Sequence, residues 1–315
     1  MDVRFLVLNN MLQDKIRGVL FGQAIGDALG LGTEFMMQKE VTRYYPNGLT
    51  DYSQIIQDHH RSRWIRGDWT DDTDMMLCIA NAIIQDKGVN TSTIAQHFKE
   101  WFNGTPMGIG RHTHMVLFFK DYVERPQKAA EAIWNLSGKK SAANGGIMRT
   151  SIIGLCRENT ETLAAEVCRL THPDPRCIGS CVIVSLLIHS LVYKDHLLAF
   201  EELIAIGERY DTRIKEYIEM AVHSDSLSTL SLEEDMGYTL KTLAAALWTL
   251  HHCHSFEEGL LAVVNAGGDT DTNAAVACSL LGAKYGCSSI PIKYIEGLRR
   301  KEYMEEVANR LMEML

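Results

Sequence analysis

Two short segments of the chain place carboxylates and hydroxyls directly before long apolar runs. The first reads TDDTD at residues 70–74, and the second reads GGDTDT at residues 267–272. One carboxylate at the start of a helix is explained by capping of free backbone amides and by the helix dipole. A second carboxylate close behind it adds like-charge repulsion that capping does not require. Two such segments, far apart in the chain, therefore favour a cation site over plain capping.

The ligand types in these segments indicate a hard divalent cation. Carboxylate and hydroxyl oxygens are present, whereas histidine and cysteine are absent from both segments. This set suits Mg²⁺, Mn²⁺ or Ca²⁺ and disfavours structural zinc. If the two segments meet in space, their carboxylates are numerous enough for two ions, as in two-metal hydrolytic sites. The spacing of an EF-hand loop is missing.

Helices are the elements that must position these residues. Apolar residues recur at helical spacing along most of the chain, for example at Ile16, Leu20 and Ala24. Strict apolar alternation is confined to a few residues, and DYSQIIQ at residues 51–57 is the one weak strand candidate. The sequence therefore predicts an all-α fold, a compact orthogonal multi-helix bundle.

Several helix ends can also be read from the sequence. A helix is expected to begin at capping residues near Asn90 and to stop at Gly104. Ser255 and Glu258 have the spacing of a capping box, and Pro291 is expected at the first position of a helix.

Composition limits the class of protein and its partners. The chain has 315 residues, of which 46% are hydrophobic, and no proline-rich linker divides it, so one domain over residues 1–315 is expected. A net charge of -9 disfavours nonspecific binding to nucleic acid or to anionic membranes. The eight cysteines are scattered without a C-x-x-C pair, which favours a reduced, cytoplasmic protein. The longest apolar run, residues 177–193, is short for a membrane span and contains His189, so a buried core helix is expected.

Five motifs, in order, resemble the ADP-ribosylglycohydrolase family. They are GVLFGQAIGDALGLGTEFM at 18–36, GDWTDDTDMML at 67–77, NGGIMR at 144–149, THPDP at 171–175 and NAGGDTDTNAAVACSLLGAKYG at 265–286. Each motif alone is moderately specific, whereas all five in this order are highly specific. The resemblance covers residues 14 to 287. It implies an all-α fold, a dinuclear Mg²⁺ or Mn²⁺ centre, and hydrolysis of the N- or O-glycosidic bond at the C1″ carbon of ADP-ribose.

The resemblance assigns roles to the acidic residues. It implies that the metal ligands are Thr70, Asp71, Asp72, Asp269, Asp271 and Thr272. It implies that Glu34 is the catalytic glutamate that reaches the metal centre and the reacting ribose. Without the resemblance, Glu34 would be interpreted as a solvated loop residue. Asp27 is expected to support the helix and not to bind metal.

The resemblance also implies a set of substrate-binding residues. These are Gly108, Gly110, Asn144, Gly145, Gly146, Met148, His172 and Tyr238. Small residues allow backbone amides to approach a diphosphate. Each position has a plain structural alternative: a turn for the glycines, a helix end for the histidine, and a core aromatic for the tyrosine. Arg149 has two interpretations, a partner of a carboxylate or phosphate and a structural ion pair.

One departure leaves the leaving group open. Arginine-specific bacterial members have an aspartate in the loop near Gly108, whereas PMGIG at residues 106–110 has none. The expected partner is therefore ADP-ribose or an ADP-ribosylated protein, with an arginine, serine, nucleobase or metabolite linkage. The alternatives are a dimetal phosphohydrolase acting on a nucleotide and a noncatalytic, crystallin-like relative. The histidines within residues 57–63 and 111–115 are interpreted as exposed or rim residues.

Overall fold

The structure is a computed structural model that describes residues 3–314. Helices make up the secondary structure of this range, and no strand forms within it, so the predicted all-α fold is confirmed. The α-helices are α1 (Val3–Gly30), α2 (Gln38–Tyr44), α3 (Asp71–Asp86), α4 (Thr91–Asn103), α5 (Arg111–Leu117), α6 (Pro126–Leu136), α7 (Thr160–Arg169), α8 (Pro175–Lys194), α9 (Phe200–Glu208), α10 (Arg213–His223), α11 (Thr239–His252), α12 (Phe256–Val264), α13 (Thr270–Tyr285), α14 (Ile292–Gly297) and α15 (Lys301–Met312). Five 3₁₀ helices are η1 (Tyr52–Gln54), η2 (Arg61–Arg63), η3 (Ile147–Leu155), η4 (Leu227–Leu230) and η5 (Cys287–Ser289).

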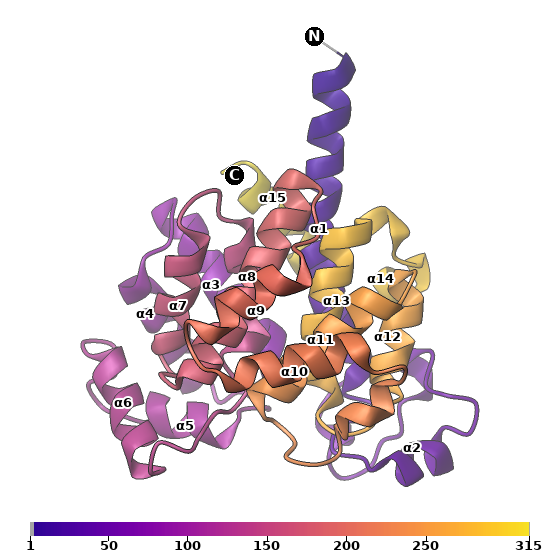
Figure 1. Cartoon of the computed structure of the whole chain (residues 1–315), viewed down its shortest axis with the longest axis horizontal. Helices are drawn as coiled ribbons and strands as arrows, with labels where there is room; N and C mark the ends of the chain where they lie inside the picture. The colour runs from indigo at the N-terminus through magenta and orange to yellow at the C-terminus, as the bar shows by residue number, and fades with distance from the viewer. Residues whose placement is uncertain (1–2, 315) are drawn as a thin grey trace.

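Helices α1 and α13 lie side by side at the centre of the molecule (Figure 1). Four glycines, spaced four residues apart on α1, form their contact: Gly18, Gly22, Gly26 and Gly30. A Cβ at any of them would overlap a backbone carbonyl oxygen of α13. Glycine therefore permits the two backbones to touch. The contact brings the C-terminal end of α1, which leads to Glu34, beside the first turn of α13.

Helix α8 is a second core element. It is the one helix in residues 3–314 that is long and apolar enough to cross a membrane, but most of its side chains are buried inside the protein. This matches the expected core helix over residues 177–193. Asp174 precedes the helix and caps it, because its carboxylate accepts a hydrogen bond from the Arg176 amide.

The weak strand candidate at residues 51–57 was wrong. This segment forms η1, whose start is capped by Asp51 through a hydrogen bond from the Ser53 amide. Its apolar alternation instead reflects a short turn that buries Tyr52 and Ile55 in the core.

The predicted helix ends are partly correct. Helix α4 is capped by Asn90 and ends before Gly104, as expected. The Ser255 hydroxyl accepts from the Glu258 amide, but the Glu258 carboxylate accepts from the His254 amide, so only half of the predicted capping box forms. Pro291 is the residue before α14 and not its first helical residue.

Candidate active site

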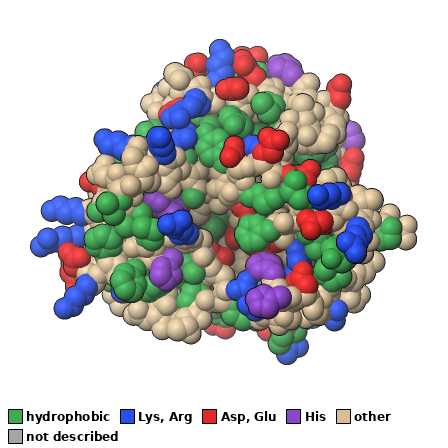
Figure 2. Space-filling model, turned by 90° about the horizontal axis from the view of Figure 1, so that it is seen from below, with side chains coloured by type: hydrophobic (Ala, Val, Ile, Leu, Met, Phe, Trp, Pro, Cys, Tyr) green, Lys and Arg blue, Asp and Glu red, His purple; other side chains and the backbone are tan. Residues whose placement is uncertain are grey.

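The first turns of α3 and α13 meet the loop after α1 at the floor of a cavity of about 850 Å³. Helices α5 and α6 contribute one side of the cavity, and the loops after α1 contribute the other. Figure 2 shows this face as a hollow framed by apolar, basic and histidine side chains. The predicted site residues that line the cavity are Glu34, Thr70, Asp71, Asp72, Gly108, Gly110, Asn144, Gly145, Met148, His172, Asp269, Asp271 and Thr272.

Two predicted site residues do not line the cavity. A Cβ at Gly146 would lie 3.0 Å from the sulfur of Cys168, so this glycine faces the core. Tyr238 lies at the start of α11, with its ring edge-on to Tyr217 and under the guanidinium of Arg176. The residue before it, Gly237, lines the cavity instead.

The acids at the start of α3 do not cap their own helix. Asp27, on α1, accepts hydrogen bonds from the amides of Thr70 and Thr73 and from the Thr73 hydroxyl, at 3.0, 3.0 and 2.6 Å. A carboxylate from another helix therefore satisfies the free amides. The expected supporting role of Asp27 fits this contact. Asp71 and Asp72 are not used for capping, and both line the cavity.

The acids at the start of α13 do not cap their own helix either. No side chain of α13 caps its first turn, and the Asp269 carboxylate instead accepts a hydrogen bond of 2.6 Å from the Asn144 amide group. The Oδ1 atoms of Asp72 and Asp271 are buried without a hydrogen-bond partner. Plain capping therefore does not explain why these carboxylates are present.

Asp74, the last acid of TDDTD, belongs to a different environment. Its carboxylate accepts hydrogen bonds from the indole nitrogens of Trp69 and Trp101, at 2.8 and 3.2 Å, and pairs with Arg300 at 3.1 Å. It is absent from the cavity wall. Asp74 thus holds neighbouring elements together.

Hydrogen bonds on both sides fix the loop that carries Glu34. The buried guanidinium of Arg61 donates to the carbonyl oxygens of Gly32 and Glu34. The Phe35 amide donates to the Gly268 carbonyl at 2.7 Å, and the Gly268 amide donates to the Met36 carbonyl at 2.8 Å. These last two bonds tie the loop to the residue that precedes Asp269.

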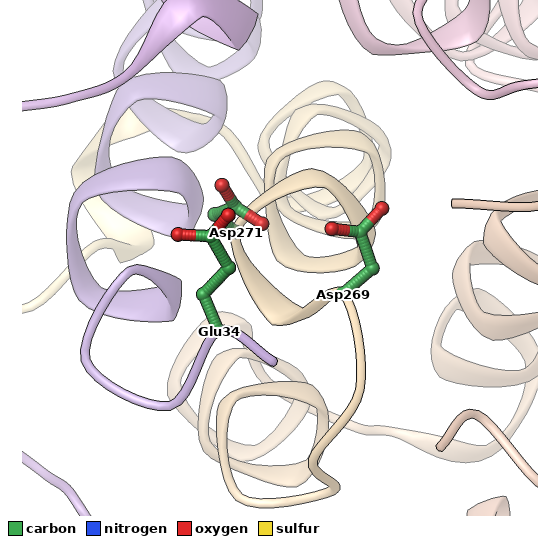
Figure 3. A group of neighbouring side chains, drawn as sticks. All are labelled: Glu34, Asp269 and Asp271. Atoms are coloured by element: carbon green, nitrogen blue, oxygen red, sulfur yellow. The ribbon is translucent and has the colours of Figure 1, made fainter. Parts of the chain in front are cut away.

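Glu34, Asp269 and Asp271 form the centre of the site. One carboxylate oxygen from each lies within 4.8 Å of the other two. Figure 3 shows the three side chains directed toward a common space, one from the loop and two from the start of α13. Glu34 lies more than 230 residues away from Asp269 and Asp271 in the chain, so the fold brings these like charges together.

Burial and mutual repulsion raise the pKa values of the acids. Burial is the largest cause at each position, and neighbouring carboxylates add to it. The pKa of Asp71 is raised to about 7 and that of Asp269 to about 6, with Glu34 contributing repulsion to both. The pKa values of Asp72 and Asp271 are raised well above the usual range. Burial also raises the pKa of Asp27 to about 7.

This donor set fits divalent cations. The buried carboxylate oxygens without donors are costly in a metal-free protein. In residues 3–314, no lysine or arginine forms an ion pair with Asp71, Asp72, Asp269 or Asp271. Oxygen ligands from carboxylates and from the Thr70 and Thr272 hydroxyls suit Mg²⁺ or Mn²⁺.

His60 is a site residue whose contact the sequence analysis missed. Its Nε2 lies 2.6 Å from Glu34 Oε2, and its Nδ1 lies 2.7 Å from Arg63 Nη2. Since a guanidinium can only donate, Nδ1 accepts from Arg63, and Nε2–H donates to Glu34. The expected rim location is right, because His60 lines the cavity with Arg63 and Trp64. The HH pair in the sequence gave no sign of the contact with Glu34.

A family model described as ADP-ribosylglycohydrolase matches residues 8–315. The chain belongs to the ADP-ribosylglycohydrolase family. The family hydrolyses ADP-ribose conjugates, and the family predicted from the five sequence motifs is confirmed.

Curated relatives cover most of the chain at low identity. The ADP-ribosyl dinitrogen reductase glycohydrolase of Rhodospirillum rubrum is 25% identical, with 92% of each chain covered. An ADP-ribosylarginine hydrolase of Serratia proteamaculans is 24% identical over 96% of this chain and 80% of its own. A solved ADP-ribosylglycohydrolase-related protein is 28% identical with a TM-score of 0.75, and the match covers 97% of this chain and 99% of that one.

Proposed function

We propose that this family member uses two Mg²⁺ or Mn²⁺ ions to cleave the glycosidic bond at C1″ of ADP-ribose. The products are ADP-ribose and a protein side chain, or the leaving group of a related conjugate. The carboxylates of Glu34, Asp269 and Asp271, within 4.8 Å of one another at the cavity floor, carry this proposal. The names of the relatives that act on ADP-ribosylarginine and on modified dinitrogen reductase support a protein substrate.

The acids and hydroxyls of α3 and α13 are the proposed metal ligands: Thr70, Asp71, Asp72, Asp269, Asp271 and Thr272. When bound, the ions supply alignment of the ribose hydroxyls and a more acidic water. The unpartnered Oδ1 atoms of Asp72 and Asp271 support this assignment, because each needs a positive partner in a buried site.

Glu34 is the proposed proton acceptor. Its Oε2 accepts a hydrogen bond from His60, whereas Oε1 has no hydrogen-bond partner among the described residues. Oε1 can therefore take the proton of an attacking water. The surrounding carboxylates stabilise the positive charge that develops on the ribose as the bond to C1″ breaks.

The cavity is large enough for a nucleotide sugar. Its volume of about 850 Å³ lies within the range typical of small-molecule sites. A Cβ at Gly108 would lie 2.8 Å from Asp71 Oδ1. The glycine loop therefore approaches the acids closely, and an aspartate at this point would add a further negative charge.

The noncatalytic alternative is disfavoured because both acidic segments are complete. We also propose a cytoplasmic location, because the eight cysteines are scattered without a C-x-x-C pair. The phosphohydrolase alternative makes different products, and the test below separates it.

The test is incubation with a panel of ADP-ribosylated substrates in Mg²⁺, in Mn²⁺ or in EDTA, followed by identification of the products. We expect free ADP-ribose with either ion and none in EDTA. AMP and ribose phosphate would instead identify a phosphohydrolase. Full activity in EDTA would overturn the metal-dependent mechanism.

A further inference from the structure

A buried arginine without a counter-charge lies behind one wall of the cavity. Arg149, in η3, has no exposed surface, and its guanidinium lies 4.4 Å above the ring of Phe98. Its Nη2 donates to Thr171 Oγ1 at 2.6 Å and to the Val167 carbonyl at 3.4 Å. Within residues 3–314 it forms no ion pair, so the structural ion pair considered for Arg149 is not formed. A buried charge without a counter-charge lowers the stability of the fold.

The hydroxyl of Thr171 connects this charge to His172. Thr171 Oγ1 has two partners, Arg149 Nη2 at 2.6 Å and His172 Nδ1 at 2.7 Å. Since arginine can only donate, the Thr171 oxygen accepts from it. The Thr171 hydrogen then has His172 Nδ1 as its acceptor. If Nδ1 carried the proton instead, the buried hydroxyl hydrogen would have no acceptor among the described residues.

The hydrogen bonds of the neighbouring histidine, His112, fix its tautomer as well. His112 Nε2 lies 2.9 Å from the Thr171 carbonyl oxygen and therefore donates to it. Its Nδ1 accepts from the Ser141 hydroxyl at 3.0 Å. The rings of His112 and His172 are 4.6 Å apart, and both line the cavity. Burial holds the pKa of His172 well below its usual value, and the neighbouring His112 and Arg149 further disfavour a positive charge on it, so the ring is neutral.

His172 Nε2 is the last atom in the series of hydrogen bonds that runs from Arg149 through Thr171. The residue is 1% exposed, and Nε2 has no hydrogen-bond partner in the protein. We propose that Arg149 and Thr171 are positioning residues that hold His172 as a fixed Nε2–H donor, and that this donor binds an anionic phosphate oxygen of the ligand.

The distribution of charge in the cavity supports an anionic oxygen at this wall. The floor carries the carboxylates of Glu34, Asp269 and Asp271, which have no hydrogen to donate to a phosphate oxygen. The wall at His172 is backed by an uncompensated positive charge, which favours one. The identity of the ligand as ADP-ribose rests on the proposed function, whereas the position of the proton does not.

The proton position is tested by long-range ¹H–¹⁵N NMR of protein labelled at its histidines. We expect His172 to carry hydrogen on Nε2 and none on Nδ1 in the wild type and in Thr171→Ser, and a mixture of tautomers in Thr171→Val. Ser141→Ala is the matched control, because it removes the donor to His112 and should change the His112 signals alone. A protonated Nδ1 in the wild type, or an unchanged His172 in Thr171→Val, would overturn the inference.

The ligand is tested by calorimetric titration with ADP-ribose and with adenosine, after melting curves have shown each variant to be folded. We expect Thr171→Val to bind ADP-ribose about tenfold more weakly, because the charged hydrogen bond from His172 Nε2–H to the phosphate is weakened. Thr171→Ser keeps the hydroxyl and should bind within about twofold of wild type. Adenosine, which lacks phosphate, should bind all three proteins equally.

Two outcomes separate this inference from the proposed function. Equal binding of ADP-ribose by the wild type and Thr171→Val would show that the hydrogen bond from Thr171 to His172 does not affect binding. The hydrolase assignment would remain intact. No binding of ADP-ribose by the wild type would overturn the proposed function and the ligand named here. The NMR result would still decide the position of the proton.

Discussion

Asp72 and Asp74 lie in the same turn of α3, yet their surroundings predict opposite effects of the same substitution. Asp72 Oδ1 is buried without a donor, whereas Asp74 accepts from two indoles and pairs with Arg300. We expect Asp72→Asn to remove most of the activity, leave the metal-free melting temperature unchanged or higher, and reduce the Mg²⁺-induced increase in melting temperature to roughly half or less.

Asp74→Asn is the matched control for Asp72→Asn. It should lower the free energy of unfolding by about 1–3 kcal/mol, because the indole and arginine donors lose a charged acceptor. Its Mg²⁺-induced shift should match that of the wild type. Melting curves of the three proteins in EDTA and in Mg²⁺ measure both effects. Equal metal-induced shifts in all three would show that Asp72 does not bind metal.

Glu34→Gln tests the proposed proton acceptor. Glutamine keeps an oxygen that can accept from His60 Nε2–H, so the loop should hold its position. Turnover should fall by about 10²–10⁴-fold, as for loss of a general base. Binding of ADP-ribose should stay within about 1 kcal/mol of wild type, a factor near five. Unchanged turnover would show that Glu34 is only a loop acid. Steady-state kinetics measures turnover, and calorimetry measures binding of ADP-ribose.

The sequence alone predicted residue types better than contacts. Oxygen-only ligands in two segments predicted a hard-metal site, and the two segments do meet. Glu34 came from the family resemblance, because a lone loop glutamate has no local signal. The contact of His60 with Glu34 depends on how two loops pack, and so does the orientation of Gly146 toward the core. Periodicity and spacing carry no information about such contacts.

At the scale of elements, one helix caps another and so leaves the acids of the second helix free for the site. Asp27 of α1 satisfies the first amides of α3, and this leaves the acids of α3 free. The glycine row on α1 holds α13 at backbone contact, which sets the separation of Glu34 from Asp269 and Asp271. Four glycines at intervals of four residues are visible in the sequence, but the partner of such a row can be identified only from the fold.

Gly22→Ala tests this glycine row. A Cβ at Gly22 would overlap the carbonyl oxygen of Cys278, so α13 must move away from α1. We expect a loss of about 1–3 kcal/mol in the free energy of unfolding, as for overpacking elsewhere. Activity should fall as well, measured below the melting transition, because the start of α13 carries the carboxylates.

Gly88→Ala is the control for this change. Gly88 lies after the end of α3, and an added Cβ would have no atom within 4 Å. It should alter stability and activity little. If Gly22→Ala were equally mild, the backbone contact between α1 and α13 would not be what sets the geometry of the site.

At the scale of the whole molecule, the α1–α13 contact joins the two ends of the chain. Gly18 and Gly282 meet in the core, so residues near both ends of the sequence share one structural unit. The expected single domain over residues 1–315 stays a prediction. The α1–α13 contact also means that the acidic cluster is assembled from both ends of the chain, and its repulsion acts on the stability of the entire fold.

That repulsion predicts how the effect of metal on stability changes with pH. The metal-free fold keeps protons on acids whose pKa is raised, to about 6 for Asp269 and about 7 for Asp71, from the usual 3.8. The unfolded chain has lost those protons in this window, so the stability of the metal-free fold falls as pH rises through it. Metal ions must displace the same protons. The Mg²⁺-induced increase in melting temperature should therefore grow between about pH 6 and pH 8.

The difference between melting temperatures in Mg²⁺ and in EDTA isolates this effect. The buried histidines His112 and His172 have lowered pKa values, so they destabilise the fold as pH falls below their usual value of 6.5. They do so with and without metal, and their contribution cancels in the difference. The pH dependence of the difference should be much weaker in Asp72→Asn. A metal-induced shift that is constant with pH, or that decreases toward pH 8, would show that these carboxylates are not the groups that bind the ions.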